Sequence, residues 1–152
     1  MSLWFQPKPR SVLYCDFAGF RVPEMTKNRP VIVLRAHKRN RRLVYVIPLS
    51  TTPPVPPQPY HFHVARSPVT HAAPTQAWAK CDMVAVVSTE RLTVGRGRSD
   101  RQTGRALRIP PMITEEEFER LRLCVAKAFG FGAGSYFYDA GMRETETAID
   151  SP

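Results

Sequence analysis

Short apolar runs, separated by polar segments that favour turns, dominate the first third of this chain. Three of these runs are rich in β-branched and aromatic residues: Ser11–Phe17, Pro30–Arg35 and Leu43–Pro48. Such residues favour the pleated backbone, so the runs predict three short strands. Between the first two runs, residues 18–29 mix charges with glycine and proline, which predicts a loop of the kind that often carries function.

The middle of the chain contains an unusual proline cluster. Five of the seven residues in Pro53–Pro59 are proline, which lacks a backbone N–H and favours an extended connector. A ligand for SH3 or WW domains has the same composition, but the position between strands favours a structural loop. Further strands are predicted at Tyr60–Ala65, at Trp78–Ser88 with an interruption near Asp82, and at residues 106–109.

The histidines and cysteines do not form a recognisable metal or disulfide site. His61 and His63 alternate onto one strand face and could chelate an ion, but no third ligand is evident nearby. Cys15, Cys81 and Cys124 are odd in number and widely spaced, without a CxxC pair. We therefore expect no metal and no cofactor, and cysteines that are reduced and mostly buried.

One helix is predicted, at about Glu115–Phe129. Thr114 and Glu117 have the spacing of a capping box, and Ile113 can pack against Phe118 beyond the cap. Apolar residues then recur at helical spacing, and Gly130 marks the end. Residues 1–131 are thus expected to form a single domain, followed by an acidic, partly disordered tail at residues 132–152.

The charge of the chain suggests a class of partner. Lys and Arg number 22 against 13 Asp and Glu, a net charge of +9, and the last 21 residues are acidic, so the body is more basic still. A basic body attracts polyanions, most commonly nucleic acid, although a basic surface without such a role remains the alternative. No apolar run approaches a membrane span, and the N-terminus lacks the features of a secretory signal, so we expect a cytoplasmic protein without a membrane partner.

Six features taken in order resemble the MazF/PemK family of bacterial toxins. They are SVLYCDF, EMTKNRPVIVL, VYVIPLST, WAKCDM, RGR and the C-terminal helix, which together cover about residues 11–130. The resemblance implies a mainly β fold with a C-terminal helix, specifically an SH3-like β-barrel of the CcdB/PemK type. It also implies a homodimer and metal-independent, sequence-specific cleavage of single-stranded mRNA, which leaves a 2′,3′-cyclic phosphate and a 5′-hydroxyl.

The resemblance nominates four catalytic residues. Arg29 offers a planar fork of donors for a phosphate, and Ser50 stands where the family has its catalytic Thr. Asp82 is the favoured acceptor of the 2′-OH proton, with Glu24 as the competing base. Pro23 stands where the PemK branch has a His, which leaves the general acid unassigned.

Five further residues are expected to contact RNA: Lys27, Thr51, Lys80, Arg96 and Arg98. Lys80 replaces an Arg of the PemK branch and is a weaker clamp. Trp78 could stack on a base, but core packing is the predicted fate of its ring. Each site residue also has an ordinary structural reading: Arg29 at a sheet edge, Ser50 in a turn, and Asp82 in a surface ion pair with Lys80 or Arg91.

Two other functions compete with the nuclease. One is a non-catalytic SH3-like module that binds nucleic acid or protein, which the departures from the family pattern would suit. The other is a gyrase inhibitor resembling CcdB, which the polar end TAIDSP disfavours. If the nuclease prediction holds, the resemblance further implies a cognate antitoxin, through which alone the protein would reach DNA.

Overall fold

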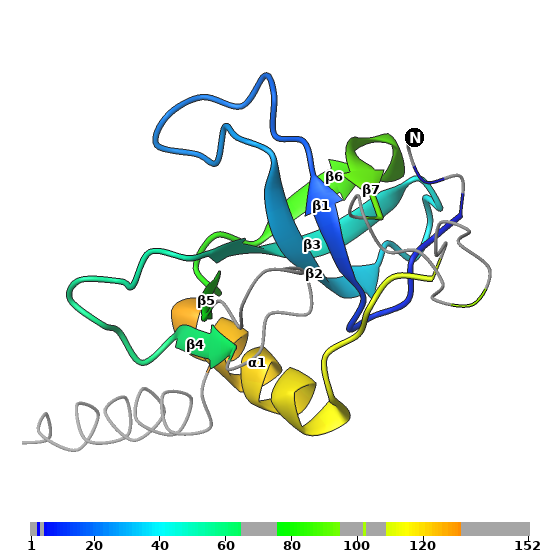
Figure 1. Cartoon of the computed structure of the whole chain (residues 1–152). Coiled ribbons are helices and arrows are strands. Elements are labelled where there is room, and N and C mark those ends of the chain that lie inside the picture. The colour runs from blue at the N-terminus through cyan, green and yellow to red at the C-terminus, as the bar shows by residue number, and fades with distance from the viewer. Residues whose placement is uncertain (1–2, 4, 65–75, 95–101, 103–108, 132–152) are drawn as a thin grey trace, which may run out of the picture.

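A computed structural model of the chain describes residues 3, 5–64, 76–94, 102 and 109–131 (Figure 1). Within these residues, seven strands form one sheet whose pairings are all antiparallel, and a single long helix follows. The strands are β1 Val12–Cys15, β2 Arg29–Ala36, β3 Leu43–Ser50, β4 His61–Val64, β5 Ala77–Lys80, β6 Ala85–Ser88 and β7 Leu92–Thr93. A short 3-10 helix, Thr89–Arg91, separates β6 from β7, and α1 spans Glu115–Ala128.

β3 is the central strand of the sheet. It pairs with β2 along one edge and with β5 and β6 along the other, and the strand order is β4-β5-β3-β2-β1-β7. This mainly β class with a C-terminal helix is the predicted one. Among the described residues, however, β4 and β7 end the path of pairings, so backbone pairing alone does not close the sheet into a barrel.

Both faces of the sheet are covered because its strands alternate buried residues between two cores. Ile32, Ile47 and Ala79 belong to the core beneath α1, which Phe118 and Leu121 complete from the helix. Val31, Val33 and Val46 point to the opposite core. Figure 1 shows α1 on one side of the sheet and the β1–β2 loop projecting from the other.

The structure confirms most of the predicted elements. Thr114 and Glu117 form a complete capping box, and Gly130 has a φ of +74°, the left-handed conformation that ends a helix. The strand expected at 78–88 is interrupted at Asp82, as predicted, and the proline segment is neither strand nor helix. Residues 106–108 of the predicted closing strand and the tail at 132–152 lie outside the described residues. None of the described helices is long and apolar enough to span a bilayer.

Candidate active site

The start of the β1–β2 loop, residues 16–28, is held by contacts with Arg91 that the sequence did not predict. The Nη1 of Arg91 donates hydrogen bonds to the carbonyl oxygens of Asp16 and Ala18 at 2.9 and 2.8 Å. The guanidinium also lies 5.3 Å from the centre of the Phe20 ring, a cation–π distance. One arginine therefore holds the first turn of the loop, which carries Glu24.

Glu24 is exposed, and its carboxylate forms a hydrogen bond with the backbone of its own loop. Its Oε2 accepts the Arg21 N–H at 2.7 Å, and its own N–H donates to the Arg21 carbonyl, also at 2.7 Å. These two bonds close a tight turn. Part of the acceptor capacity of this carboxylate is thus committed to backbone structure.

Asp82 lies in the turn that interrupts the strand between β5 and β6. The Met83 N–H donates to the Lys80 carbonyl at 3.0 Å and closes this turn. Asp82 is exposed, and its carboxylate has no hydrogen-bond or ion-pair partner among the residues that the structure describes. Pairing of Asp82 with Lys80 or Arg91, the structural alternative, is therefore not observed.

Glu24 and Asp82 line the same pocket, which has a volume of about 430 Å³. Its other walls are mainly apolar: Phe17, Phe20, Pro23 and Met25 beside Glu24, Pro48 from β3, and Met83, Val84, Ala85 and Val86. The fold thus brings together the two carboxylates that the sequence nominated, although 58 positions separate them in the chain.

Arg29 and Ser50 lie at the same end of the sheet, on the face with this pocket. The pairing of β2 with β3 ends at Val31 and Pro48. Continued by two residues on each strand, the same register places Arg29 and Ser50 opposite one another. Directly opposed residues of antiparallel strands share a face. Arg29 is opposite Cys15 on its other side, and Ser50 is opposite Trp78 of β5.

The Arg29 side chain has an N–H donor without a partner among the described residues, whereas the Ser50 hydroxyl oxygen already accepts a backbone hydrogen bond. The Nε of Arg29 is buried and has no hydrogen-bond partner among the described residues. Ser50 is only 8% exposed, and its Oγ accepts the Thr52 N–H at 3.3 Å, as in an ordinary strand-end turn. The hydroxyl hydrogen of Ser50 still leaves one donor for a ligand.

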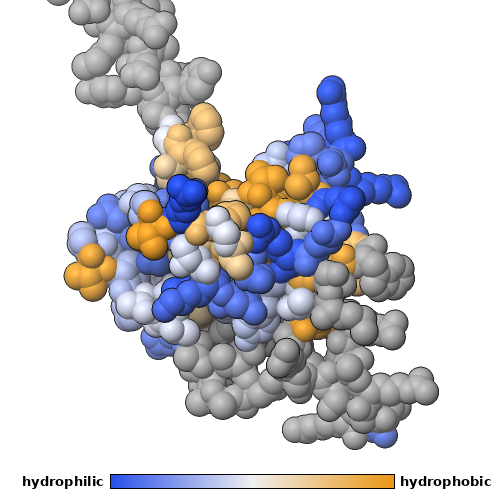
Figure 2. All heavy atoms as spheres, turned by 90° about the horizontal axis from the view of Figure 1, so that it is seen from above, coloured by the Kyte–Doolittle hydropathy of each residue, from blue (hydrophilic) through white to orange (hydrophobic). Residues whose placement is uncertain are grey.

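The structure describes three of the five residues that are expected to contact RNA. Lys80 is partly exposed on β5, directly opposite His61 of β4, and Lys27 and Thr51 are exposed in the loops that flank the site. Arg96 and Arg98 lie outside the described residues. Seen from above, on the side of the β1–β2 loop, the surface is largely hydrophilic with separate apolar patches (Figure 2).

Trp78 is the clearest correction to the sequence analysis. Core packing was predicted, yet the side chain is only partly buried, while its neighbours Ala77 and Ala79 are buried. The two alanines face the core under α1, so alternation directs the indole to the other face. There it lies against the His63 ring, with ring centroids 4.7 Å apart.

The cysteines are free, as predicted. Burial raises the pKa of Cys81 to about 12, with smaller contributions from the neighbouring Cys124 and Asp82. Burial likewise raises the pKa of Cys15 to about 12. Both thiols remain protonated at neutral pH and are unsuited to act as nucleophiles. Among the described residues, no three His, Cys, Asp or Glu side chains are grouped as a metal site would require.

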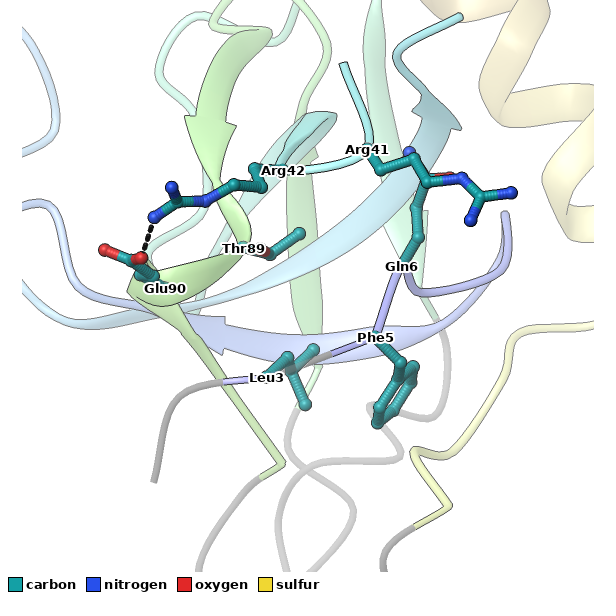
Figure 3. Close-up of a pocket in the computed structure, with 7 residues that line it drawn as sticks. All are labelled: Leu3, Phe5, Gln6, Arg41, Arg42, Thr89 and Glu90. Carbon is teal, nitrogen blue, oxygen red and sulfur yellow. Dashed lines mark hydrogen bonds and ion pairs between the residues drawn. The ribbon is translucent and has the colours of Figure 1, made fainter. Parts of the chain in front are cut away.

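A larger pocket, of about 650 Å³, lies where the N-terminal segment meets the β2–β3 turn and the 3-10 helix (Figure 3). Leu3, Phe5, Gln6, Arg41, Arg42, Thr89 and Glu90 line it, and none of them is a predicted site residue. Its single carboxylate, Glu90, is already paired with Arg42. We therefore place the candidate active site at the smaller pocket, which two of the nominated residues, Glu24 and Asp82, line.

Comparison with known proteins identifies the family of the chain. Residues 8–109 match the family described as PemK-like, MazF-like toxin of type II toxin-antitoxin system. No curated protein sequence matches the chain.

Solved structures share the fold at low sequence identity. An endoribonuclease from a mycobacterial species, solved in complex with its cognate antitoxin, is 19% identical with a TM-score of 0.54 and covers 83% of this chain and 97% of its own. The Mycobacterium tuberculosis toxin MazF-mt6 is 17% identical, also with a TM-score of 0.54, over 81% of this chain and 99% of its own. MazF from Deinococcus radiodurans has the same TM-score at 16% identity, over 83% of this chain and 98% of its own.

Proposed function

Because the chain belongs to the PemK-like, MazF-like toxin family of type II toxin–antitoxin systems, we propose that it is a metal-independent endoribonuclease acting on single-stranded mRNA. The observation that carries this proposal is the pocket lined by Glu24 and Asp82, which includes Pro48 of β3. Pro48 pairs with Val31, and the same register continued by two residues brings Arg29 and Ser50 to this end of the sheet. A cation, a hydroxyl and two carboxylates supply the groups that such cleavage needs.

In this mechanism Asp82 accepts the proton of the ribose 2′-OH. Its carboxylate has no partner among the described residues, whereas the Glu24 carboxylate accepts the Arg21 N–H at 2.7 Å. The 2′-oxygen attacks the adjacent phosphorus and the bond to the 5′-oxygen breaks, so no water is consumed. The products are a 2′,3′-cyclic phosphate and a 5′-hydroxyl.

Arg29 stabilises the charge that develops on the phosphorane. Its buried Nε has no protein acceptor among the described residues, and a phosphate oxygen would be a charge-assisted acceptor for a guanidinium donor. Ser50 adds a hydroxyl donor, and Lys80 contributes a positive charge from the neighbouring strand. The leaving 5′-oxygen takes its proton either from Arg29 or from protonated Asp82.

The proposal includes partners. The mycobacterial endoribonuclease was solved with its cognate antitoxin, and a MazE–MazF structure from Deinococcus radiodurans has a TM-score of 0.53 to this chain. We propose that this protein also binds an antitoxin, forms a homodimer and is located in the cytoplasm. The basic charge of the chain suits both RNA and an acidic antitoxin segment.

The decisive experiment compares Arg29→Ala with Arg35→Ala. Both arginines lie on β2, but Arg35 is exposed and does not line the pocket, so it controls for loss of positive charge. Purified protein, freed of any antitoxin, is incubated with long single-stranded RNA in EDTA, and the product ends are mapped. We expect cleavage at a short recurring sequence with 5′-hydroxyl ends, reduced about 100-fold or more by Arg29→Ala and unchanged by Arg35→Ala.

Two outcomes would overturn the proposal. Wild-type protein that is folded and free of antitoxin but does not cleave RNA would indicate a binding module with this fold. Equal cleavage by wild type and Arg29→Ala would remove Arg29 from the mechanism and place the chemistry elsewhere.

A further inference from the structure

A row of directly opposed side chains crosses β4, β5 and β3. His63 on β4 is directly opposite Trp78 on β5, and Trp78 is directly opposite Ser50 on β3. Extending the β2–β3 pairing by two residues beyond Val31 and Pro48 places Arg29 next in this row. Opposed residues of adjacent strands lie about 5 Å apart and share a face, so an aromatic pair stands immediately beside the candidate phosphate site.

We infer that Trp78, supported by His63, is a stacking platform for the RNA base next to the phosphate held by Arg29 and Ser50. This inference rests on the proposed function and deepens it by assigning a base subsite to the β4–β5 hairpin. Tryptophan presents a large flat surface to any base, whatever its hydrogen-bonding edge. The subsite thus binds unpaired nucleotides without selecting their sequence.

The surroundings of Trp78 fit a ligand better than a structural role. The ring is only partly buried, while every residue of β5 that faces α1 is buried. Its packing partner in the row is the tilted His63 ring, at 4.7 Å and 51°, which supports one part of the indole. An aromatic ring that is fixed in place but still accessible is what base stacking requires.

The charges around the ring favour a nucleic acid over an apolar protein segment. Lys80 lies two residues along β5 from Trp78, on the same face, and forms no ion pair with a described residue. Arg29 stands at the far end of the row. Lys80 lies along β5 from Trp78 and Arg29 lies across the strands from it, so an RNA segment stacked at the ring has two cations nearby for its phosphates.

The two histidines of β4 have different roles. The Nδ1 of His61 accepts the Gln58 N–H at 3.0 Å, so this ring closes the turn that precedes β4. His63 makes no such bond among the described residues and contacts Trp78 instead. His61→Ala is therefore a matched control for His63→Ala.

The test measures binding separately from cleavage. Fully 2′-O-methylated single-stranded RNA lacks the attacking hydroxyl, so its affinity reports on binding without cleavage. The chain has two tryptophans, and a Trp4→Phe background makes the emission report on Trp78. We expect RNA to quench this emission. Trp78→Ala should weaken binding roughly tenfold to a hundredfold, Trp78→Phe less, and His63→Ala more than His61→Ala.

The salt dependence of RNA affinity distinguishes a contribution from base stacking from one that arises from positive charge. Lys80→Ala should lower the slope of log affinity against log salt by about one, while Trp78→Ala should leave this slope unchanged. Unchanged emission on RNA addition, together with wild-type affinity for Trp78→Ala, would overturn the inference. So would a loss of self-association in Trp78→Ala, measured by sedimentation, because it would make the ring a subunit contact.

The inference and the proposed function can fail separately. Quenching and weakened binding in a protein that never cleaves RNA would leave the subsite standing without the nuclease. Cleavage with normal RNA affinity in Trp78→Ala would keep the nuclease and reject the subsite.

Discussion

The guanidinium of Arg91 donates to the Ala18 carbonyl at 2.8 Å, across 73 positions of sequence. Arg91 ends the 3-10 helix between β6 and β7, while Ala18 starts the loop that carries Glu24. A residue outside the pocket therefore fixes one wall of it. Nothing in the sequence around Arg91 signals this role, because it depends on where the two segments meet.

Replacing Arg91 with alanine should loosen the β1–β2 loop without unfolding the protein. The change removes two hydrogen bonds and a cation–π contact, and we expect the free energy of unfolding to fall by about 1–3 kcal/mol. Amide exchange in residues 18–28 should accelerate, and the KM for RNA should rise more than kcat falls. Arg42→Ala, which breaks an exposed ion pair elsewhere, should leave that exchange unchanged. Unaltered exchange in Arg91→Ala would show that the loop holds its shape independently.

The two carboxylates of the pocket should respond differently to amide substitution. Asp82→Asn removes the proposed base, and we expect a loss of kcat of about 10²- to 10⁴-fold in single-turnover cleavage. Glu24→Gln keeps an amide oxygen that can still accept the Arg21 N–H, so activity should remain within about tenfold of wild type. The reverse pattern would make Glu24 the base and Asp82 a structural residue.

The capping box at α1 offers a test of stability away from the site. In Thr114→Ala the Glu117 N–H loses its acceptor, and we expect about 1 kcal/mol lower free energy of unfolding in urea. Thr114→Ser restores the hydroxyl and should recover most of that loss. Because α1 covers the core opposite the pocket, the specific activity of folded Thr114→Ala should not change.

Alkaline pH should destabilise the fold through the buried thiols. Burial raises the pKa of Cys15 and Cys81 from 9.0 to about 12. The unfolded chain therefore loses these protons first, and the stability from keeping them neutral is complete below pH 9 and lost as the pH rises toward 12. Each thiol contributes at most about 1.4 kcal/mol per pH unit within that window.

This alkaline effect is measured as the free energy of unfolding in urea between pH 8 and 11. Cys81→Ala should reduce the slope by about half relative to wild type, since Cys15 would then be the remaining buried thiol. The partly exposed Cys124 provides the control, and Cys124→Ala should retain most of the slope. A flat profile in the wild-type protein would contradict the assigned burial effect.

The sequence by itself determined the local structure. The β-branched runs predicted β1, β2 and β3 to within a few residues, and alternation predicted β4. The proline cluster predicted a connector without regular structure. Thr114, Glu117 and Gly130 marked both ends of α1, because capping and left-handed backbone depend only on residues within one or two turns. The ordered motifs also identified the family.

Only the tertiary structure decided which of these segments are neighbours. Alternation along β5 does not reveal which of its faces α1 will cover, so the sequence wrongly placed Trp78 in the core. The row of side chains from His63 toward Arg29 forms because β3 pairs with β2 along one edge and with β5 along the other. Strand pairing and register are chosen by burial of both sheet faces at once, a property of the whole chain that no single segment encodes.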